Sequence, residues 1–427
     1  MNEKSRDSSS GADPASGKGG LWAWINKRLP VDSFISHELT GYFAPKNFNF
    51  WYFFGSLAML VLVMQIATGI FLTMYYKPSA AAAFGSVQFI MREVQWGWLI
   101  RYMHSTGASF FFIVVYLHMF RGMMYGSYRK PRELLWLIGM AIYLCLMAEG
   151  FFGYLLPWGN MSFWGAQVIL NLVGAIPYVG GDLVTWVRGD FVISGLTLNR
   201  FFALHVVAIP LVLVALVFLH VVALHHVGSN NPDGIEIKKN KGADGKPLDG
   251  IPFHPYYTVH DLVGIVIFLF VFLGVVFFWP AGGGHFLEAP NFTPANPLHT
   301  PPHIAPVWYY TPFYAMLRAT PSMFGSAFPG VIVMGASIAI LFVLPWLDRS
   351  PVKSLRYKGW MSKVWLGIFV VSFLGLGRIG MIEPSPVVVF LARSLTVLYF
   401  LYFLLMPFYT SMETVKRVPE RVTGGKH

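Results

Sequence analysis

The sequence has few charged residues and almost no cysteine. Asp, Glu, Lys and Arg make up 12% of its 427 residues, and hydrophobic residues make up 55%, whereas about 25% of the residues of a soluble domain are charged. This balance excludes an ordinary soluble protein and predicts a membrane protein. The one cysteine, Cys145, excludes an intrachain disulfide, a CxxCH haem attachment and an iron–sulfur cluster held by this chain alone.

The first twenty residues, MNEKSRDSSSGADPASGKGG, lack the apolar core of a cleaved secretory signal. We therefore expect residues 1–25 to stay as a flexible tail. The net charge of +11 would indicate nucleic-acid binding only if the basic residues clustered on one solvated face. They lie instead in loops between apolar runs, so membrane topology explains the charge better.

Eight apolar runs are long enough to cross a hydrocarbon core of about 30 Å. They lie near residues 50–76, 98–125, 134–156, 197–226, 259–281, 324–347, 361–380 and 387–409. The predicted fold is an all-α polytopic membrane protein whose first four helices, within 26–230, form one bundle. A loop over 231–258, a second four-helix region over 259–409 and a tail over 410–427 complete it.

The loop charges predict the orientation. With eight spans, both termini lie on one side, and the segments on that side carry 23 of the 31 Lys and Arg residues. By the positive-inside rule this side is cytoplasmic. Two long connections, 157–196 and 281–323, then lie on the outer side, and the Pro and aromatic residues of the second predict a folded cap.

Two spans carry histidines at matching intervals. His104 and His118 are fourteen residues apart, and His205 and His220 are fifteen apart. Either spacing advances about 21 to 22 Å along a helix and returns to within about 60° of the same direction. Because both spans run inward, we expect His104 to meet His205 near the outer surface and His118 to meet His220 near the inner surface.

Three other roles are open to membrane histidines: helix packing, proton relay and metal-ion transport. None of them predicts two stacked pairs without a supporting series of carboxylates. Two haem irons, each with two axial imidazoles, do predict this pattern.

Glycines repeat the same interval. Gly55 and Gly69 lie fourteen apart in the first span, and Gly139 and Gly153 fourteen apart in the third. Glycine allows the close approach that a flat macrocycle between helices needs. A single such pair would be ordinary in a membrane helix, but two pairs that share the histidine interval favour haem binding.

Two arginines accompany the histidines of the second span. Arg101 lies three residues before His104, and Arg121 three residues after His118. Each can reach back along the helix to a haem propionate. The alternative for each is an ordinary arginine at the membrane boundary.

After about residue 25, the chain resembles cytochrome b of the proteobacterial type. Cytochrome b is the haem-carrying subunit of ubiquinol:cytochrome c oxidoreductase (respiratory complex III). The resemblance rests on the histidine pairs and on RYMH at 101–104, GYLLPWGNMSFWGA at 153–166, GSNNPDG at 228–234, DGIPFHPYYTVHD at 249–261 and FTPANPLHTPPHIAPVWYY at 292–310.

The resemblance implies two b-type haems, the low-potential one on His104 and His205 and the high-potential one on His118 and His220. It also implies that ubiquinol is oxidised on the outer side, that quinone is reduced on the inner side, and that this chemistry drives proton translocation. The implied partners are a Rieske iron–sulfur protein, a cytochrome c1-type subunit and a second copy in a homodimer. The implied location is the bacterial inner membrane.

The resemblance also implies the residues of an outer quinol pocket. They are Tyr154, Trp164, Gly165, Ala166, Pro306, Val307, Trp308, Tyr309 and Tyr314. Many relatives have Glu where this chain has Val307, and valine cannot accept the proton that the glutamate is often assigned. We expect the intramembrane carboxylate Glu149 to take that role, with Glu288 as the alternative.

The implied inner quinone site uses His225, Ser229 and Asp261, whose imidazole and carboxyl groups can deliver protons to a reduced quinone. His260 stands where mitochondrial relatives often have Lys. We expect His226, which adjoins His225, to be a surface residue.

Two rival functions are a two-haem membrane anchor of a quinone-linked dehydrogenase and a transporter with histidine coupling sites. The first would lack the PVWY segment and the last four spans. Neither rival accounts for matched histidine and glycine intervals together.

Overall fold

The structure is a computed structural model that describes residues 20–35, 41–323 and 325–424. Residues 1–19 of the predicted N-terminal tail and 425–427 of the C-terminal tail lie outside these ranges. Before the first span, the chain forms the short helices α1 (Leu21–Arg28) and α2 (Val31–Ile35) and the strand β1 (Phe43–Pro45).

The eight predicted spans are confirmed. They are α3 (Phe53–Thr73, preceded by η2, Phe50–Tyr52), α5 (Gly97–Tyr125), α6 (Glu133–Leu155), α9–η3–α10 (Gly195–Val227), α11 (Thr258–Phe278, preceded by η5, Phe253–Tyr257), α13 (Phe328–Leu347), α14 (Trp360–Gly380) and α15 (Pro386–Leu404). Each is long and apolar enough to cross a membrane, and hydrocarbon requires that its backbone groups bond within the helix.

Two span ends differ from the prediction by several residues. The sixth span begins at Phe328 rather than 324, because Gly325 has a positive φ of 72° and belongs to the preceding turn. The last ends at Leu404 rather than 409. Pro407 lies in the first turn of the separate helix α16 (Met406–Met412) and has no N–H to continue the ladder of α15.

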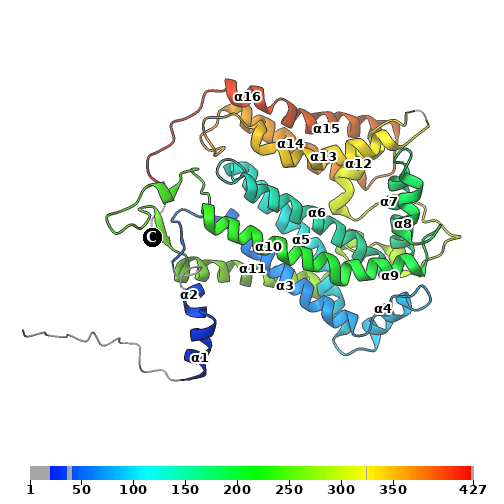
Figure 1. The fold of residues 1–427 in the computed structure, drawn as a ribbon. Helices are drawn as coiled ribbons and strands as arrows, with labels where there is room; N and C mark the ends of the chain where they lie inside the picture. The colour runs from blue at the N-terminus through cyan, green and yellow to red at the C-terminus, as the bar shows by residue number, and fades with distance from the viewer. Residues whose placement is uncertain (1–19, 36–40, 324, 425–427) are drawn as a thin grey trace, which may run out of the picture.

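The spans form two groups, which Figure 1 shows one above the other. The first group contains α3, α5, α6, α10 and α11, and the second contains α13, α14 and α15 together with α12 (Thr311–Ala319). In its most apolar stretch, 44% of α5 is buried, against 6% of the Gly195–Val227 span. Helix α5 is therefore the enclosed centre of the first group, whereas the fourth span faces outward.

Both described ends of the chain lie on one side of the molecule, at the left in Figure 1, which we call the terminal side. The opposite, far side carries α4 (Ala83–Arg92) and two long connections. The first connection folds into α7 (Asn160–Gly174) and α8 (Gly180–Arg188). The second contains η6 (Gly282–Gly284), η7 (Ala289–Phe292), η8 (Trp308–Tyr310) and α12.

These two connections join into a cap. The backbone N–H of Asn160 donates to the Thr293 oxygen at 2.9 Å, and that of Ala295 to the Trp158 oxygen at 2.9 Å. The cap therefore closes over the far-side ends of the first group through ordered backbone contacts.

The terminal side is held by polar contacts. Strand β1 pairs antiparallel with β2 (Gly250–Pro252), and the loop between α10 and β2 includes η4 (Ile237–Lys239). Arg132 bonds both carboxylate oxygens of Glu236, at 2.6 and 2.9 Å. This two-point contact fixes the loop after α10 against the turn before α6.

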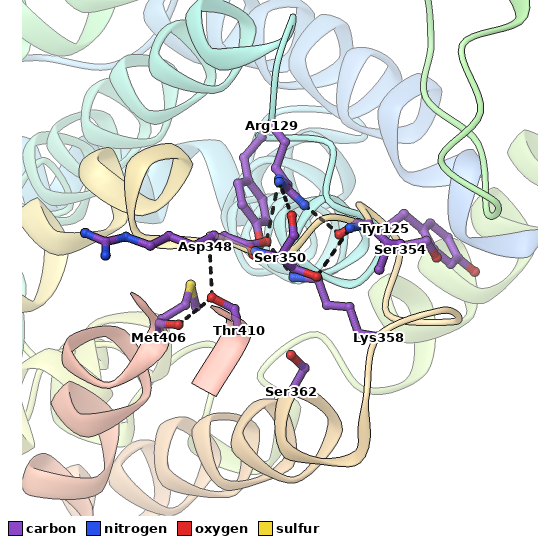
Figure 2. Close-up of polar contacts among 12 residues, drawn as sticks. Tyr125, Arg129, Asp348, Ser350, Ser354, Lys358, Ser362, Met406 and Thr410 are labelled. Atoms are coloured by element: carbon purple, nitrogen blue, oxygen red, sulfur yellow. Dashed lines mark hydrogen bonds and ion pairs between the residues drawn. The ribbon is translucent and has the colours of Figure 1, made fainter. Parts of the chain in front are cut away.

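A buried carboxylate joins the two groups of spans at the terminal side (Figure 2). Asp348, just after α13, accepts a hydrogen bond from Tyr128 Oη at 2.6 Å and pairs with Lys358 Nζ at 2.5 Å. Burial would raise the pKa of Asp348, but Lys358 and Arg129 outweigh it and hold that pKa below its ordinary value. The carboxylate therefore stays ionised inside the protein.

Removing the cation should destabilise the fold. In Lys358→Met the ionised Asp348 would remain buried without its closest positive charge, and the free energy of unfolding should fall by about 3 kcal/mol. Thermal unfolding in detergent, followed by circular dichroism, measures the change. The matched control is Arg417→Met, which removes a pair with Glu420 that is 89% and 88% exposed. An equal shift in both variants would contradict this role of the network.

Candidate functional site

The far-side histidine pair lies between α5 and the π-helical turn η3 (Leu204–Ala208). The rings of His104 and His205 have centroids 6.1 Å apart and planes at 88°. In η3 the Ile209 N–H donates to the Leu204 oxygen, five residues back, so the turn holds one residue more than an α-helical turn. This added residue compensates for the fifteen-residue spacing and brings His205 and His220 into phase with the pair on α5.

Hydrogen bonds at Nδ1 orient both far-side rings. Nδ1 of His104 lies 2.9 Å from Oγ1 of Thr68, and that hydroxyl donates to the Met64 oxygen at 2.7 Å. Nδ1 of His205 lies 3.0 Å from the backbone oxygen of Glu149 and 2.9 Å from its Oε1. Since these partners accept, Nδ1 carries the proton and Nε2 keeps a free lone pair. Metal-binding histidines have this arrangement.

The second pair joins α5 to α10 nearer the terminal side. The rings of His118 and His220 have centroids 6.4 Å apart and planes at 62°. Nη2 of Arg121 lies 3.3 Å from Nδ1 of His118, and the guanidinium lies over the Tyr52 ring at 4.8 Å. Its Nε is buried and has no hydrogen-bond partner among the described residues. A guanidinium with a buried, unpartnered donor atom favours an anionic ligand here.

Four glycines lie against the four imidazoles. The contacts are Gly55 with His118, Gly69 with His104, Gly139 with His220 and Gly153 with His205. A Cβ at Gly69 or Gly139 would lie 3.2 Å from the imidazole Cε1, closer than ordinary van der Waals contact. Each glycine therefore gives one ring the space to lie between the helices.

A cavity of about 250 Å³ lies beside the far-side pair. Its lining includes Gln65, Tyr76, Arg101, His104, Glu149, Tyr154, His205, Asn291 and Tyr309. Apolar side chains complete the walls, among them Phe112, Phe286, Leu287 and Val307. The cavity therefore connects the imidazoles with the far-side cap.

Some of the residues predicted for the outer pocket line the cavity, and the others lie outside its lining. Tyr154, Val307 and Tyr309 line the cavity, and the Tyr309 ring stacks on Phe112 at 3.8 Å. The six others do not line it in this structure: Trp164, Gly165, Ala166, Pro306, Trp308 and Tyr314.

Some of these six residues stabilise the cap or the cavity wall. The indole of Trp164 donates to the Asn296 oxygen at 3.1 Å, and that of Trp308 to Oγ of Ser109 at 3.1 Å. A Cβ on Gly165 would lie 3.6 Å from Cε1 of Tyr154, so this glycine packs directly against that ring.

In the second connection, sequence reasoning missed three lining residues, Phe286, Leu287 and Asn291. They belong to the HFLEAPN segment of the second connection. The signal that would have found them is a pair of apolar residues directly before a lone carboxylate in an otherwise Gly- and Pro-rich loop.

The predicted inner-site residues form two contact sets on the terminal side. His225 stacks on Tyr42 with ring centroids 4.4 Å apart, and Tyr42 Oη lies 2.7 Å from Oγ of Ser229. Asp261 lies with His260 instead, with 3.8 Å between Oδ1 and Nδ1. Tyr42 was not predicted, because it precedes the first span and lies far from its partners in sequence.

The ligand sets indicate what kind of group the histidines can hold. In the described parts of the chain, no cluster of three or more His, Cys, Asp or Glu side chains could hold a bare metal ion. Each histidine pair offers two nitrogens, which suits an iron whose other ligands come from a macrocycle.

Two family models match the chain. The model described as cytochrome b/b6/petB covers residues 39–228, and the model described as cytochrome b (C-terminal)/b6/petD covers residues 294–400. The first contains both histidine pairs, and the second contains the PVWY segment.

Curated relatives extend the similarity to nearly the whole chain. Cytochrome b of Allochromatium vinosum is 66% identical over 406 residues, which cover 94% of this chain and 98% of that protein. Cytochrome b of Rhodospirillum rubrum is 50% identical, covering 94% and 95%. A protein named cytochrome b/c1 from Bradyrhizobium diazoefficiens is 45% identical, covering 94% of this chain and 57% of that protein.

A solved structure described as a hyperthermophilic respiratory complex III has the same fold. The TM-score is 0.84 at 39% sequence identity, and the alignment covers 92% of this chain and 99% of the other.

The glycine contacts can be tested directly. In Gly139→Val, the new side chain would push the His220 ring from its place, and haem bound per protein should fall by about half. Haem is measured by extraction and absorbance. The control is Gly367→Val, at an exposed helical glycine where an added Cβ meets nothing within 4 Å. Full haem content in Gly139→Val would show that this glycine is not required for the ring position.

Proposed function

The chain belongs to the cytochrome b family, and we propose that it is the membrane-embedded electron-transfer subunit of a quinol:cytochrome c reductase. The observation that carries this proposal is the pair of facing imidazole sites, stacked at two levels between the same helices. A transporter or a simple structural bundle has no need of two matched imidazole pairs.

The geometry of the pairs fits two b-type haems. Two metal–nitrogen bonds of about 2 Å, continued to the ring centres, put opposed imidazole centroids about 6 Å apart. The observed separations are 6.1 and 6.4 Å. In this proposal His104 and His205 hold the low-potential haem, and His118 and His220 hold the high-potential haem.

Two arginines fit the anionic edges of such cofactors. Arg101 lines the cavity beside His104, and Arg121 has a buried, unpartnered Nε beside His118 within the described structure. Each would bind a propionate. When bound, the haems supply one-electron transfer between two levels about 21 Å apart along α5.

The part of the far-side cavity toward the cap, lined by Tyr154, Val307 and Tyr309, is the proposed quinol-oxidising site, because a haem on His104 and His205 would take up the part beside the imidazoles. It is mostly apolar, adjoins the far-side imidazoles and presents the hydroxyls of Tyr154 and Tyr309, which can orient a quinol. A two-electron donor that feeds a one-electron chain needs a second acceptor. Because the chain has a single cysteine, it holds no iron–sulfur cluster of its own, and we propose a Rieske iron–sulfur protein as the partner.

The terminal-side residues are the proposed quinone-reducing site. His225 and Ser229 meet at Tyr42, and Asp261 provides a carboxyl group next to His260. An imidazole and a carboxyl group can deliver protons to a reduced quinone. Proton uptake there and release at the far side would move protons across the membrane.

The loop charges support the direction of that transfer. The segments predicted to lie on the terminal side carry 23 of the 31 Lys and Arg residues. We therefore propose that this side faces the cytoplasm and that the protein lies in a bacterial inner membrane. We further propose a cytochrome c1-type subunit and a homodimeric complex. The relative named cytochrome b/c1 and the neighbour described as complex III support the first of these partners.

The function is tested by spectra and by quinol. The purified complex should show b-type bands after dithionite, and ubiquinol should reduce these haems in a reaction sensitive to inhibitors of the outer site. A protein without b-type bands is not a cytochrome b, and haems that quinol does not reduce would contradict the assigned site.

A ligand variant tests the pairing. His118→Leu removes one of the two imidazoles that would hold the high-potential haem, and haem per chain should fall from about two to about one. His226→Leu, at an exposed histidine near the end of α10, is the matched control and should keep both haems. An unchanged haem complement in His118→Leu would contradict the ligand assignment.

A further inference from the structure

Oxidation of a quinol in the far-side cavity must release protons, so the cavity needs a group that accepts one and passes it outward. The predicted acceptor, Glu149, lies in the wall, but its Oε1 is 2.9 Å from Nδ1 of His205. That contact directs the carboxylate to an imidazole which, in the proposed function, binds iron. Glu149 is therefore placed to orient the ring rather than to serve the cavity.

Two other titratable groups in the wall, His104 and Tyr76, are also engaged. Nδ1 of His104 is bonded to Thr68, and the hydroxyl of Tyr76 donates to the Leu156 oxygen at 2.7 Å. Arg101 is a cation and accepts no proton. Val307, in the PVWY segment of the wall, has no titratable group.

Tyr154 differs from these groups because its hydroxyl leads to a carboxylate. It lies near the far-side end of α6 and lines the cavity, and its Oη donates to Oε2 of Glu288 at 3.0 Å. Glu288 is the residue before η7, in the cap, and it is partly exposed. Exposed residues, Gly284 and His285 before it and Ala289 after it, surround it in the loop. The pair therefore spans the distance from the cavity wall to the far-side surface.

We infer that Glu288 accepts, through Tyr154, one of the protons released by quinol oxidation. The O–H bond of one quinol hydroxyl breaks as its proton passes to the Tyr154 oxygen, and the Tyr154 proton passes to Oε2 of Glu288. The two electrons leave to the one-electron acceptors of the proposed function, on which this inference rests. The other hydroxyl proton leaves with the electron that the iron–sulfur partner takes, and Glu288 then releases its proton to the far-side solvent.

The environment of Glu288 suits an acceptor that must also release its proton. Burial raises its pKa to about 7, partly offset by a backbone hydrogen bond and by the bond from Tyr154. The titratable groups that interact electrostatically with Glu288 are two phenols, Tyr154 from α6 and Tyr309 from η8. Since the carboxylate is the accepting form, turnover should rise with pH through about 7.

The test is the pH profile of ubiquinol oxidation by the intact complex with Glu288→Gln, from about pH 5.5 to about pH 9. We expect kcat to fall about 100-fold, KM to change little and the acid limb near the carboxyl pKa to disappear. Glu288→Asp should restore most of the rate and the acid limb. Tyr154→Phe breaks the same relay and should lower kcat in the same direction.

Controls separate this role from a structural one. Glu383→Gln changes an exposed far-side glutamate between α14 and α15 and should leave rate and pH profile unchanged. Reduced-minus-oxidised spectra and haem content of Glu288→Gln should match the unmodified complex, because neither histidine pair is altered.

Two results would overturn the inference. One is a Glu288→Gln complex with the original rate and acid limb. The other is loss of the acid limb in Glu149→Gln but not in Glu288→Gln, which would return the role to Glu149. Failure of the unmodified complex to oxidise quinol, with both haems present, would instead remove the proposed function itself.

Discussion

The other features of the first helix group depend on the facing imidazoles of α5 and the fourth span. These features are the enclosure of α5, the π-turn η3 and the placement of the glycines. His104 and His118 both lie on α5, the most enclosed helix of this group, so their polar rings avoid lipid. The π-turn η3 adjusts the phase of α10 so that both pairs meet. Glycines on α3 and α6 then admit the rings at the points of contact. The rotation of each helix, the distance between helices and the positions of the glycines must therefore all fit the same pairs of rings.

Two far-side carboxylates have different partners and, in our proposal, different tasks. Glu149 reaches the imidazole of His205 from within α6, whereas Glu288 reaches the phenol of Tyr154 from the cap. One contact orients a proposed iron ligand, and the other connects the cavity wall to the surface. In this proposal the cap takes part in the chemistry as well as covering the cavity, because it supplies a carboxylate that Val307 cannot provide.

The terminal side serves mainly to join the helix groups. The buried Asp348 with Lys358 and Tyr128, and Arg132 with Glu236, connect segments that are distant in sequence. Buried charges of this kind tolerate few alternative arrangements, since an unpaired partner is costly. Arg132 also donates to the Gly228 oxygen at 2.9 Å, beside Ser229 of the second proposed quinone site.

Sequence alone determined the eight spans, their all-α class and the intervals that match His104 with His205 and His118 with His220. These features follow from helical rise and rotation, which are local and periodic. Tertiary structure alone decided that Tyr42 stacks on His225, that Tyr154 bonds Glu288, and which residues of the PVWY region line the cavity. Such contacts join loops to distant helices through side-chain packing, and no periodic pattern in the chain encodes them.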